Sequence, residues 1–492
     1  MALPIALYST AQVRALDAHA IKELGIPGYV LMKRAGEAAL RYLRTRWPMA
    51  HRIVIVCGKG NNAGDGYVLG RFAHAAGLTV TLLSAGSPEQ LGGDAKLAYE
   101  DFKSSGGQVH PFAPELLSQG DVIVDALLGT GLSGGVREDL GRVIEKINSA
   151  GRPVFAIDVP SGLDSDTGIP LGHTVRADCT ITFVGLKTGL FIGDGPEYTG
   201  TVYFDDLEIE APPASEFKPG LERIVDSEIK RALPRRPRAA HKGNFGRVLI
   251  IGSGSGMPGA TRLSGEACLR VGAGLVTVAV APENVAAISS GRPELICLAL
   301  TNVGVLTEAL ERAEIIAIGP GLGRTQWASD ALHAVLATDK PLVVDADALN
   351  LIAEAGSPPR DNWILTPHPG EAGRLLDIST EEIQADRLSA LDRLVARYGG
   401  TVVLKGAGTV VGTKGRIPAL CERGNPGMAS AGTGDVLTGA VAGILAQCRD
   451  TWLAARVGVL VHAMAGDAAA RTGERGLIAS DIARELHNCV NL

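Results

Sequence analysis

Paired cysteines are missing from this chain. Its 492 residues include only seven cysteines, which are widely spaced and form no CxxC pair and no histidine cluster at zinc spacing. An odd number used in this way argues against a disulfide framework and against a structural zinc site. We therefore expect reduced and mostly buried thiols.

Segments that would direct the chain to a membrane are also missing. The first residues, MALPIALYST, have no basic flank and too short an apolar run for a signal peptide, and no segment approaches about 18 uninterrupted apolar residues. A block of positive charge is absent too, because the formal net charge is −6 and Lys and Arg are spread along the chain. We expect a cytoplasmic protein with small-molecule partners and no nucleic-acid or membrane partner.

Two common nucleotide-binding signatures are absent or incomplete. No GxxxxGK[ST] occurs, which removes the P-loop NTPases. Residues 58–66, before a helix predicted at 66–76, and residues 254–259 fit loose GxGxxA and GxGxxG fingerprints. The ribose-binding carboxylate expected about twenty residues later is missing, because Ser84 and Ala281 stand there. A dinucleotide-dependent dehydrogenase is therefore disfavoured.

What is present indicates two α/β domains. With 46% hydrophobic and 20% charged residues, the chain has material for large cores. Short apolar runs alternate with helical segments, which is typical of parallel sheets covered by helices on both faces. Strands are predicted at residues 52–57, 78–84, 122–126 and 154–159, and again at 247–251, 275–280, 315–318, 342–344, 363–365 and 401–404.

A connector separates the two alternations. Prolines and charges cluster in APPASEFKPG and LPRRPRAAHKG, a composition that does not pack continuously. We therefore predict a first domain at residues 1–210, a connector at 211–236 and a second domain at 237–492. Within the connector we predict one short element, at residues 227–232.

Polar side chains gather at the predicted strand ends of the first domain. Asn61 and Asn62 follow one strand in GKGNNAGDG, Asp125 ends another before GTGLSGG, and Asp158 and Ser161 follow a third in DVPSGLD. Because the carboxyl ends of parallel strands line one crevice, these side chains should converge there. Oxygen ligands beside glycines indicate a nucleotide or cation site. The alternative is ordinary turn chemistry, with Asx-turns at the two asparagines and a helix cap at the serine.

The glycine-rich stretch at residues 425–439, NPGMASAGTGDVLTG, indicates phosphoryl transfer. It places Gly432, Gly434 and Asp435 at the start of an apolar, helix-forming run through Leu445. Unpaired N–H groups at a helix start form an anion site, glycines let a phosphate approach, and a carboxylate beside them can take a proton from a hydroxyl. The alternative is an ordinary helix N-cap.

These motifs together resemble a known family. GKGNNAGDG, DALLGTGL and DVPSGLDSDTG resemble the epimerase domain of NAD(P)H-hydrate repair enzymes, and HKGNFGRVLIIGS, IGPGLG, TPHPGE, LKGAGT and NPGMASAGTGDVLTG resemble their dehydratase domain. The resemblance runs from residue 9 to residue 485. It implies a Rossmann-like three-layer sandwich followed by a ribokinase-like three-layer fold.

The resemblance also implies the chemistry. The family's substrates, NADHX and NADPHX, are NADH and NADPH carrying water across a ring double bond, with a hydroxyl on C6 in the R or S configuration. The first domain is expected to interconvert the epimers. The second is expected to return the S form to NAD(P)H, consuming ADP with Mg²⁺ and releasing AMP and phosphate. Glycines do not distinguish ADP from ATP, and ADP is inferred from the bacterial-like fusion of the two domains.

For the dehydratase domain, the resemblance makes Asp435 the base that activates the C6 hydroxyl, with the amides of residues 431–434 stabilising the transferred phosphoryl group. The nucleotide-binding positions implied are Lys405, Gly406, Ala407, Gly408, Thr409 and Gly434, and those for the hydrated nicotinamide are Ala260, Gly321, Leu322, His368 and Asp435.

Some of these residues have plainer interpretations. Lys405 could be a solvated lysine before a β-turn, and His368 could be a structural histidine bonded to the backbone. Asp345, Asp347 and Asn350 in VVDADALN end another strand, where they could help hold Mg²⁺ or cap a turn. We leave these three outside the predicted site.

For the epimerase domain, the resemblance assigns a potassium ion to Asn62, Asp125 and Ser161, and acid–base work to Asp158. Ala63 stands where the common pattern has glycine, so a positive φ there would strain the loop. The implied substrate positions are Asn61, Asn62, Ala63, Gly64, Asp65, Gly129, Thr130, Gly131, Leu132, Ser133, Gly134, Gly135 and Asp158.

Two rival interpretations remain. One is a ribokinase-like kinase for a small alcohol, which would share AGTGD but not the attached GKGNNAGDG domain. The other makes the first domain a non-catalytic interaction module, against which the retained Asp125 and Asp158 and the acidic balance argue. We also expect a homo-oligomer.

Overall fold

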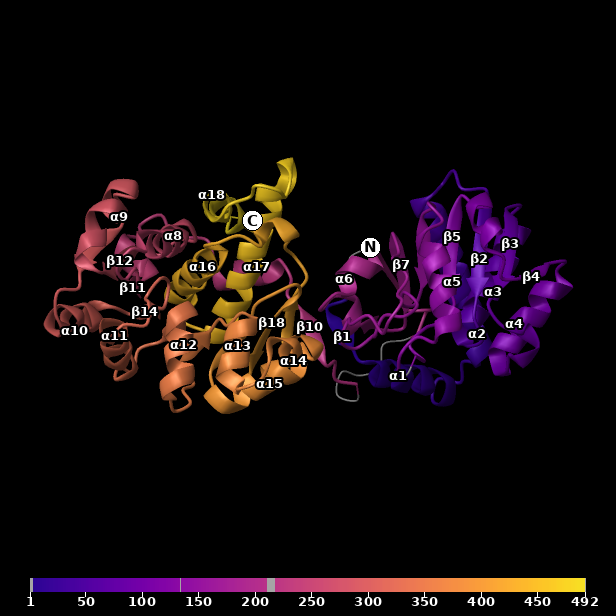
Figure 1. Cartoon of the computed structure of the whole chain (residues 1–492), viewed down its shortest axis with the longest axis horizontal. Coiled ribbons are helices and arrows are strands. Elements are labelled where there is room, and N and C mark those ends of the chain that lie inside the picture. Colours follow the sequence, from indigo (N-terminus) through magenta and orange to yellow (C-terminus); the bar gives the residue numbers. More distant parts are fainter. Residues whose placement is uncertain (1–2, 133, 210–216, 492) are drawn as a thin grey trace. The chain divides into compact units, whose positions relative to one another are not determined.

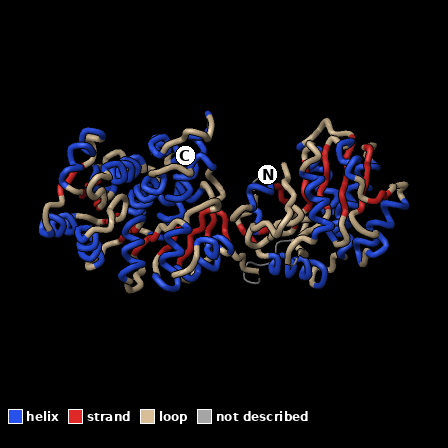
Figure 2. Tube along the Cα trace, in the orientation of Figure 1, coloured by secondary structure: helices blue, strands red, loops and turns tan. Residues whose placement is uncertain are grey.

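The computed structural model of the chain describes residues 3–132, 134–209 and 217–491. The chain divides into two compact units, Met1–Leu221 and Glu222–Leu492. Helices cover the central sheet of each unit, as Figures 1 and 2 show. Both units therefore have the layered α/β architecture predicted from the sequence.

A seven-stranded sheet forms the centre of the first unit. Its order is β4-β3-β2-β5-β6-β7-β9, and every neighbouring pair is parallel. Its strands are β2 (Arg52–Cys57), β3 (Thr79–Ser84), β4 (Val109–Pro111), β5 (Val122–Ala126), β6 (Val154–Ile157), β7 (Cys179–Phe183) and β9 (Thr201–Asp205). The unit also contains α1 (Thr10–Lys22), α2 (Gly28–Arg46), α3 (Asn61–Ala75), α4 (Gly93–Ser104), α5 (Glu138–Asn148), α6 (Gly195–Thr199) and the parallel pair β1 (Ala6–Tyr8) and β8 (Leu186–Lys187).

Alternate residues of the strands in the first unit face two separate cores. Ile53 and Ile55 of β2 pack in one core with residues of α2, α3 and α4. Val54 and Val56 of the same strand pack in the other core with Ile144 of α5. This alternation follows from strand geometry, and apolar residues in both phases are what a sheet covered on both faces requires.

Helix α3 begins earlier than the sequence predicts. It starts at Asn61 with Gly60 as its N-cap, so NNAGD forms its first turns instead of a loop before residue 66. The sequence interpretation was wrong here because asparagine, glycine and aspartate are typical turn residues. Close packing fixes the path of the chain into the helix, since a Cβ on Gly58 would lie 2.0 Å from the Leu127 carbonyl oxygen. Ala63 is helical without a positive φ, so the strain considered there does not arise.

A mixed sheet forms the centre of the second unit. Its order is β13-β12-β11-β14-β15-β16-β17-β18-β19-β10. Neighbours from β13 to β17 are parallel, β18 is antiparallel to β17 and β19, and β10 is parallel to β19. The strands are β10 (Leu221–Arg223), β11 (Arg247–Ile251), β12 (Leu275–Val280), β13 (Ile296–Ala299), β14 (Ile315–Ile318), β15 (Leu342–Val344), β16 (Trp363–Leu365), β17 (Thr401–Leu404), β18 (Thr409–Thr413) and β19 (Ala419–Cys421).

The helices of the second unit flank this sheet (Figure 1). They are α7 (Ser227–Ala232), α8 (Pro258–Arg270), α9 (Val285–Gly291), α10 (Val303–Arg312), α11 (Gln326–Leu336), α12 (Ala346–Ala355), α13 (Pro369–Leu376), α14 (Thr380–Ala385), α15 (Arg387–Tyr398), α16 (Thr433–Cys448), α17 (Thr451–Ala469) and α18 (Ala479–Cys489).

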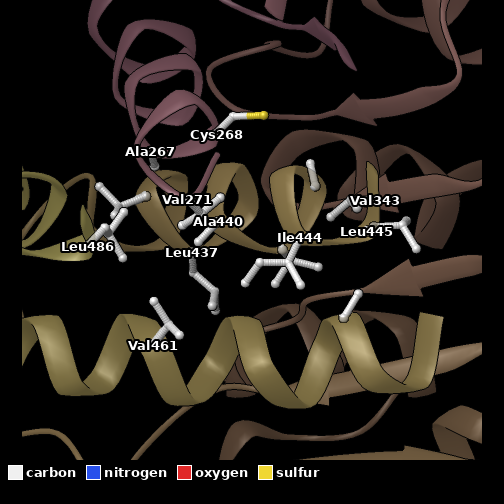
Figure 3. Packing of buried hydrophobic residues seen from close by; sticks show 14 of the residues in the cluster. Ala267, Cys268, Val271, Val343, Leu437, Ala440, Ile444, Leu445, Val461 and Leu486 are labelled. Atoms are coloured by element: carbon white, nitrogen blue, oxygen red, sulfur yellow. The ribbon is translucent and has the colours of Figure 1, made fainter. Parts of the chain in front are cut away.

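Helix α16 runs through the core of the second unit. Figure 3 shows Leu437, Ala440 and Ile444 among apolar side chains of neighbouring helices. Small residues let α8 approach closely, since a Cβ on Gly439 would lie 1.9 Å from the Ser264 carbonyl oxygen. This packing holds in place the helix that begins at the predicted phosphoryl-transfer motif.

Helix α17 is apolar enough to resemble a membrane span. By length and composition alone, Thr451–Thr472 is the one such helix in the part of the chain that the structure describes. Of its most apolar segment, 72% is buried inside the protein, where α17 packs against α16. An all-round apolar surface is also what a core helix needs, and α17 is one.

The second half of the predicted connector is packed. Element α7 forms at the expected position, and Ile224, Ile229 and Ala232 belong to the core of the second unit. Glu228 of α7 and Arg456 of α17 form a buried ion pair at 2.6 Å. Composition concealed this packing, because apolar residues are interspersed among the prolines and charges.

Candidate active sites

A cavity of about 680 Å³ opens in the first unit beside the residues that follow β2, β5 and β6. This is the crevice at the carboxyl ends of the strands where ligands of open α/β sheets bind. Of the predicted epimerase positions, those that line it are Asn61, Asn62, Asp65, Gly129, Thr130, Gly131, Leu132, Gly135 and Asp158.

Other predicted positions lie elsewhere. Ala63 is fully buried, and Gly64 faces α2, since a Cβ on it would lie 2.5 Å from Sδ of Met32. Gly134 does not line the cavity, and Ser133 lies outside the described residues. Ala63 and Gly64 therefore lie on the side of α3 that packs against the protein, while the other side of the helix faces the cavity.

Asn62, Asp125 and Ser161 come together at the ends of β5 and β6. The Ser161 hydroxyl donates to Oδ1 of Asp125 at 2.6 Å, and the Ser161 N–H donates to Oδ2 at 2.8 Å. The side-chain amide of Asn62 and the Ser161 hydroxyl both donate to the Leu128 carbonyl, at 3.0 and 3.1 Å. Burial raises the pKa of Asp125 to about 6, although hydrogen bonds from Ser161 and Leu127 lower it.

One oxygen of this group lacks a partner. Oδ1 of Asn62 is buried and accepts no hydrogen bond from the residues that the structure describes. Buried polar atoms are normally satisfied, so an orphaned oxygen beside a buried carboxyl group calls for an explanation. A hard cation that prefers oxygen ligands fits such a donor set.

Asp158 lies at the cavity wall with an unusual backbone. Its φ is 66°, in the left-handed region, and such outliers cluster at functional sites. Nζ of Lys187 lies 2.5 Å from Oδ1 of Asp158 and also donates to the Phe183 carbonyl at 2.8 Å. The Thr182 hydroxyl donates to the same carboxylate oxygen at 3.2 Å. A buried ammonium group therefore fixes and neutralises this carboxylate.

Two more carboxyl groups, on Asp17 and Asp65, line the same cavity. Burial raises the pKa of Asp17 to about 6, Lys187 lowers it and Asp158 raises it. Burial, then Asp158 and Asp17, drive the pKa of Asp65 well above its ordinary value, against a lowering by Lys187. Sequence reasoning missed Asp17 and Lys187. A signal for Asp17 existed, because it shares a face of α1 with apolar residues.

In the second unit, Asp435 lies in the first turn of α16, a helix whose N-cap is Gly432 with φ 88°. The pKa of Asp435 is raised to about 7, chiefly by burial and then by the carboxylate of Asp345, against a lowering by Lys405. A carboxyl group that titrates near neutral pH is suited to accept a proton. The helix start beside it offers unpaired N–H groups to an anion.

Asp345, left outside the predicted site, is the centre of a buried polar cluster. Lys405 contacts its Oδ1 at 2.7 Å, Thr366 donates to the same oxygen at 2.9 Å, and Thr438 of α16 donates to Oδ2 at 2.7 Å. Asp345 is 1% exposed. It therefore ties Lys405 and α16 together beside Asp435, a role that its position at a strand end could have suggested.

The neighbours of Asp345 in VVDADALN do other work. Asp347 accepts a hydrogen bond from the Gly323 N–H at 2.8 Å, and Asn350 accepts one from Arg374 at 2.7 Å. Asp347 thus contacts the loop at Gly323, and Asn350 contacts α13 through Arg374.

His368 caps α13 through its backbone-facing nitrogen. Its Nδ1 accepts hydrogen bonds from the N–H groups of Gly370 and Glu371, at 3.0 and 3.3 Å. Burial, followed by the charges of Lys405 and Arg374, lowers its pKa, so the ring is neutral at neutral pH. Half of the side chain is exposed, and its Nε2 lies 3.4 Å from Oε1 of Glu371.

The loop that starts at Lys405 is held by an arginine that the sequence did not reveal. Arg387 is 4% exposed and donates to the carbonyls of Leu404, Lys405 and Gly408. Gly406 has φ 141°, and a Cβ there would lie 2.8 Å from the Arg387 guanidinium. Lys405 is therefore no solvated turn residue: its side chain is 18% exposed and faces Asp345.

Other predicted dehydratase positions also come together. A Cβ on Gly434 would lie 3.4 Å from Nζ of Lys405, so this glycine leaves room beside the ammonium group. A Cβ on Gly321 would lie 2.9 Å from Cβ of Ala260, so these two positions adjoin. Leu322 is 1% exposed, which makes Gly321 the accessible member of that pair.

Comparisons with known proteins give these sites a context. The model of the family described as NAD(P)H-hydrate dehydratase matches residues 248–488, and that of the family described as YjeF-related protein N-terminus matches residues 28–189. The Bifunctional NAD(P)H-hydrate repair enzyme Nnr of Coxiella burnetii is 46% identical over 486 residues, covering 99% of each chain. The protein of that name from Escherichia coli is 44% identical over 493 residues, 100% of this chain and 95% of its own.

Solved structures match the second half of the chain. A ribokinase-like superfamily protein from Enterococcus faecalis has a TM-score of 0.52 and 33% identity, covering 55% of this chain and 95% of its own. The ADP/ATP-dependent NAD(P)H-hydrate dehydratase of Bacillus subtilis, co-crystallised with ATP and Mg²⁺, has a TM-score of 0.50 and 28% identity, with coverages of 54% and 96%. Full-length identity, both family models and these folds agree: the chain belongs to the family of bifunctional NAD(P)H-hydrate repair enzymes.

Proposed function

We propose that this chain repairs hydrated nicotinamide dinucleotides. Its first unit interconverts the R and S forms of NADHX and NADPHX, and its second unit dehydrates the S form with ADP, giving NAD(P)H, AMP and phosphate. We assign the first activity to residues 1–210 and the second to residues 237–492, with 211–236 between them. The positions of the two family matches support this division.

The observation that carries the dehydratase proposal is Asp435 at the glycine-lined start of α16, with a pKa raised to about 7. Hydroxide leaves a carbon poorly, but phosphate leaves well. Asp435 takes the proton of the C6 hydroxyl, whose oxygen then receives the terminal phosphoryl group of ADP as AMP leaves. The ring nitrogen expels phosphate from C6, and loss of a proton from C5 gives the dihydronicotinamide.

The residues around Asp435 suit a nucleotide donor. Lys405 brings positive charge, and Gly434 and the amides at the helix start accommodate phosphate oxygens. The described residues contain no group of three or more His, Cys, Asp or Glu able to hold a metal ion. Mg²⁺ would therefore be held mainly by the nucleotide phosphates, as is usual for this ion. The Bacillus subtilis protein crystallised with ATP and Mg²⁺ supports a metal–nucleotide donor.

We propose that Ala260, Gly321 and His368 contact the hydrated nicotinamide. The small residues leave space for the ring, and the half-exposed side chain of the neutral histidine offers a contact surface beside it.

In the first unit we propose a potassium ion held by Asn62, Asp125 and Ser161. The orphaned Oδ1 of Asn62 and the buried carboxyl of Asp125 support it, because a cation would satisfy both. When bound, the ion supplies positive charge beside the cavity. The protein's own residues hold the strand ends and the start of α3 in register around it.

A direct test uses the separated R and S hydrates of NADH with the purified full chain. With the S form and ADP, we expect reduced-nicotinamide absorbance to recover with one AMP formed per molecule. With the R form, recovery should follow after epimerisation. Recovery at full rate without any nucleotide would refute the dehydratase proposal, and equal use of ATP would refute ADP as the specific donor.

A further inference from the structure

The cavity of the first unit holds three carboxyl groups and one buried ammonium group. Asp17 comes from α1, Asp65 from α3 and Asp158 from the end of β6, while Lys187 lies in β8. Lys187 is 2% exposed and pairs with Asp158 at 2.5 Å. One ammonium group neutralises one carboxylate, and a second buried negative charge beside it is costly. The cavity therefore favours a proton on at least one of the other carboxyl groups.

Asp17 is placed to exchange that proton. It follows Val13 and Leu16 on the buried side of α1, lines the cavity, and has no hydrogen-bond partner among the residues that the structure describes. Burial raises its pKa to about 6, Lys187 lowers it and Asp158 raises it. Burial, followed by the charges of Asp158 and Asp17, also raises the pKa of Asp65, and Lys187 lowers it.

We propose that Asp17 and Asp158 are the acid and the base of epimerisation, and that Lys187 is the positioning residue that holds the Asp158 carboxylate through their ion pair. The inference rests on the epimerase function proposed for the first unit. Asp17 and Lys187 were assigned to no role by the motifs, so the inference adds one catalytic residue and one positioning residue to that site.

The positions of Asp17 and Asp158 around Lys187 favour one of two chemical routes for epimerisation. Asp17, Asp158 and Lys187 line one cavity, and the charge of Lys187 acts on both carboxyl groups. We therefore place both carboxyl groups on the same side of the bound ring, where the C6 hydroxyl oxygen and the ring nitrogen N1 are bonded to one carbon. Loss of hydroxide and return of water from the other face would instead need proton transfers on opposite faces. Ring opening needs an acid and a base side by side.

The ring-opening step balances without a co-reactant. Asp158 takes the hydroxyl proton, C6 becomes an aldehyde as the C6–N1 bond breaks, and the electron pair of that bond on N1 takes the proton from Asp17. Rotation about C5–C6 turns the other aldehyde face to N1. The nitrogen then adds to C6, its proton returns to Asp17, and Asp158 returns its proton to the oxygen. Both carboxyl groups end as they began.

The test follows epimerisation in the full chain without nucleotide, so that the dehydratase is idle. Pure R hydrate of NADH is added and the S form is measured by chromatography, with the spontaneous rate subtracted. We expect Asp17→Asn and Asp158→Asn each to lower kcat by about 10²- to 10⁴-fold, the usual contribution of acid–base catalysis. Asp139→Asn, at an exposed site on α5, removes the same charge and should leave the rate unchanged.

Further variants separate chemistry from folding. Asp17→Glu keeps the acid and should recover part of the rate, and Lys187→Arg should retain more activity than Lys187→Met. In the wild type, kcat should fall as pH rises above about 6, because Asp17 must carry its proton, and Asp17→Asn should abolish that fall. Every variant should still dehydrate the S hydrate when ADP is added, which shows an intact chain.

The outcomes distinguish the proposed acid–base pair from the epimerase function on which it rests. A wild type that does not epimerise overturns both. An active wild type with an equally active Asp17→Asn variant overturns the inference and leaves the epimerase function standing. In H₂¹⁸O, ring opening retains the C6 oxygen during the first turnovers, so ¹⁸O in every newly formed S molecule would overturn the ring-opening route.

Discussion

The two units contain the same electrostatic arrangement in different surroundings. Each pairs a lysine with an aspartate, Lys187 with Asp158 at 2.5 Å in the first and Lys405 with Asp345 at 2.7 Å in the second. Each also has a neighbouring carboxyl group whose pKa burial raises, to about 6 and about 7 respectively. One buried ammonium group cannot neutralise two carboxylates, so both sites hold an acid near its titration point.

Hydrogen-bond donors decide which carboxyl group reacts. In the second unit, Thr366 and Thr438 both donate to Asp345, which gives it a structural role. Asp435 has no hydrogen-bond partner within the described ranges and lies at the helix start where we propose that a phosphoryl group binds. In the first unit, Asp158 has one further side-chain donor, Thr182, and it lines the cavity itself. In both units the buried lysine–aspartate pair sets the charge balance of the site. The number of further hydrogen-bond donors to the paired aspartate then decides whether that aspartate is structural or reactive.

The strongest test of this contrast is Asp435→Asn. Without the base, dehydration of the S hydrate with ADP should fall by about 10²- to 10⁴-fold, or about 3 to 5 kcal/mol in the barrier. Epimerisation in the same sample should be unchanged. Reduced-nicotinamide absorbance measures the first activity and chromatography the second. A variant that keeps most of its dehydratase turnover would remove Asp435 from the base role.

A second test concerns the oxygen cluster of Asn62, Asp125 and Ser161 in the first unit. Ser161→Ala should raise the K⁺ concentration needed for half-maximal epimerisation by about 10- to 100-fold, the usual cost of losing a group at a metal site. Dehydration should show no such change.

The matched control for that test is Thr174→Val. Thr174 is also buried and also donates a hydrogen bond in this region, to the Gly162 carbonyl at 2.9 Å, but it lies outside the cluster. Its K⁺ requirement should stay at the wild-type value. An epimerase that needs no K⁺ at all would contradict the proposed ion.

The pH profiles of the two activities should slope in opposite directions. Asp435 must be ionised to act as a base, so dehydration should fall about tenfold for each pH unit below its pKa of about 7. Asp17 must be protonated to act as an acid, so epimerisation should decline above its pKa of about 6. Rates of both activities between pH 5 and 8 check this. Parallel slopes would show that one of the two roles is wrong.

Local sequence was enough to predict the architecture. Periodicity identified the central strands of both units, and the helix that begins beside Asp435 forms where the glycine-rich stretch places it. The strands β4, β7 and β9 of the first unit and β10, β13, β18 and β19 of the second escaped prediction, because their pairing partners define them more than their own short sequences.

The charge arrangement of the sites could be predicted only in part. Asp435 stands in a motif at a helix start and Asp158 in a motif at a strand end. Backbone geometry favours ligand binding at both kinds of position, so both residues could be predicted. Lys187, Asp17 and Arg387 act across long sequence separations, and Lys187 lies 29 residues from the carboxylate that it holds. No spacing rule links such pairs, because tertiary packing brings them together.

The smallest expected effect on activity tests whether the units stand independently. Gly439→Ala forces a Cβ to within 1.9 Å of the Ser264 carbonyl oxygen between α16 and α8. Such overpacking should destabilise the second unit by about 1 to 3 kcal/mol, lowering its melting temperature by about 2 to 4 °C per kcal/mol. Gly259→Ala is the control, because it lies in α8 with open space around it. If calorimetry showed the melting temperature of the first unit falling by the same amount, the two units would unfold as one cooperative structure. Their similar electrostatic arrangements could then not be treated as independent of each other.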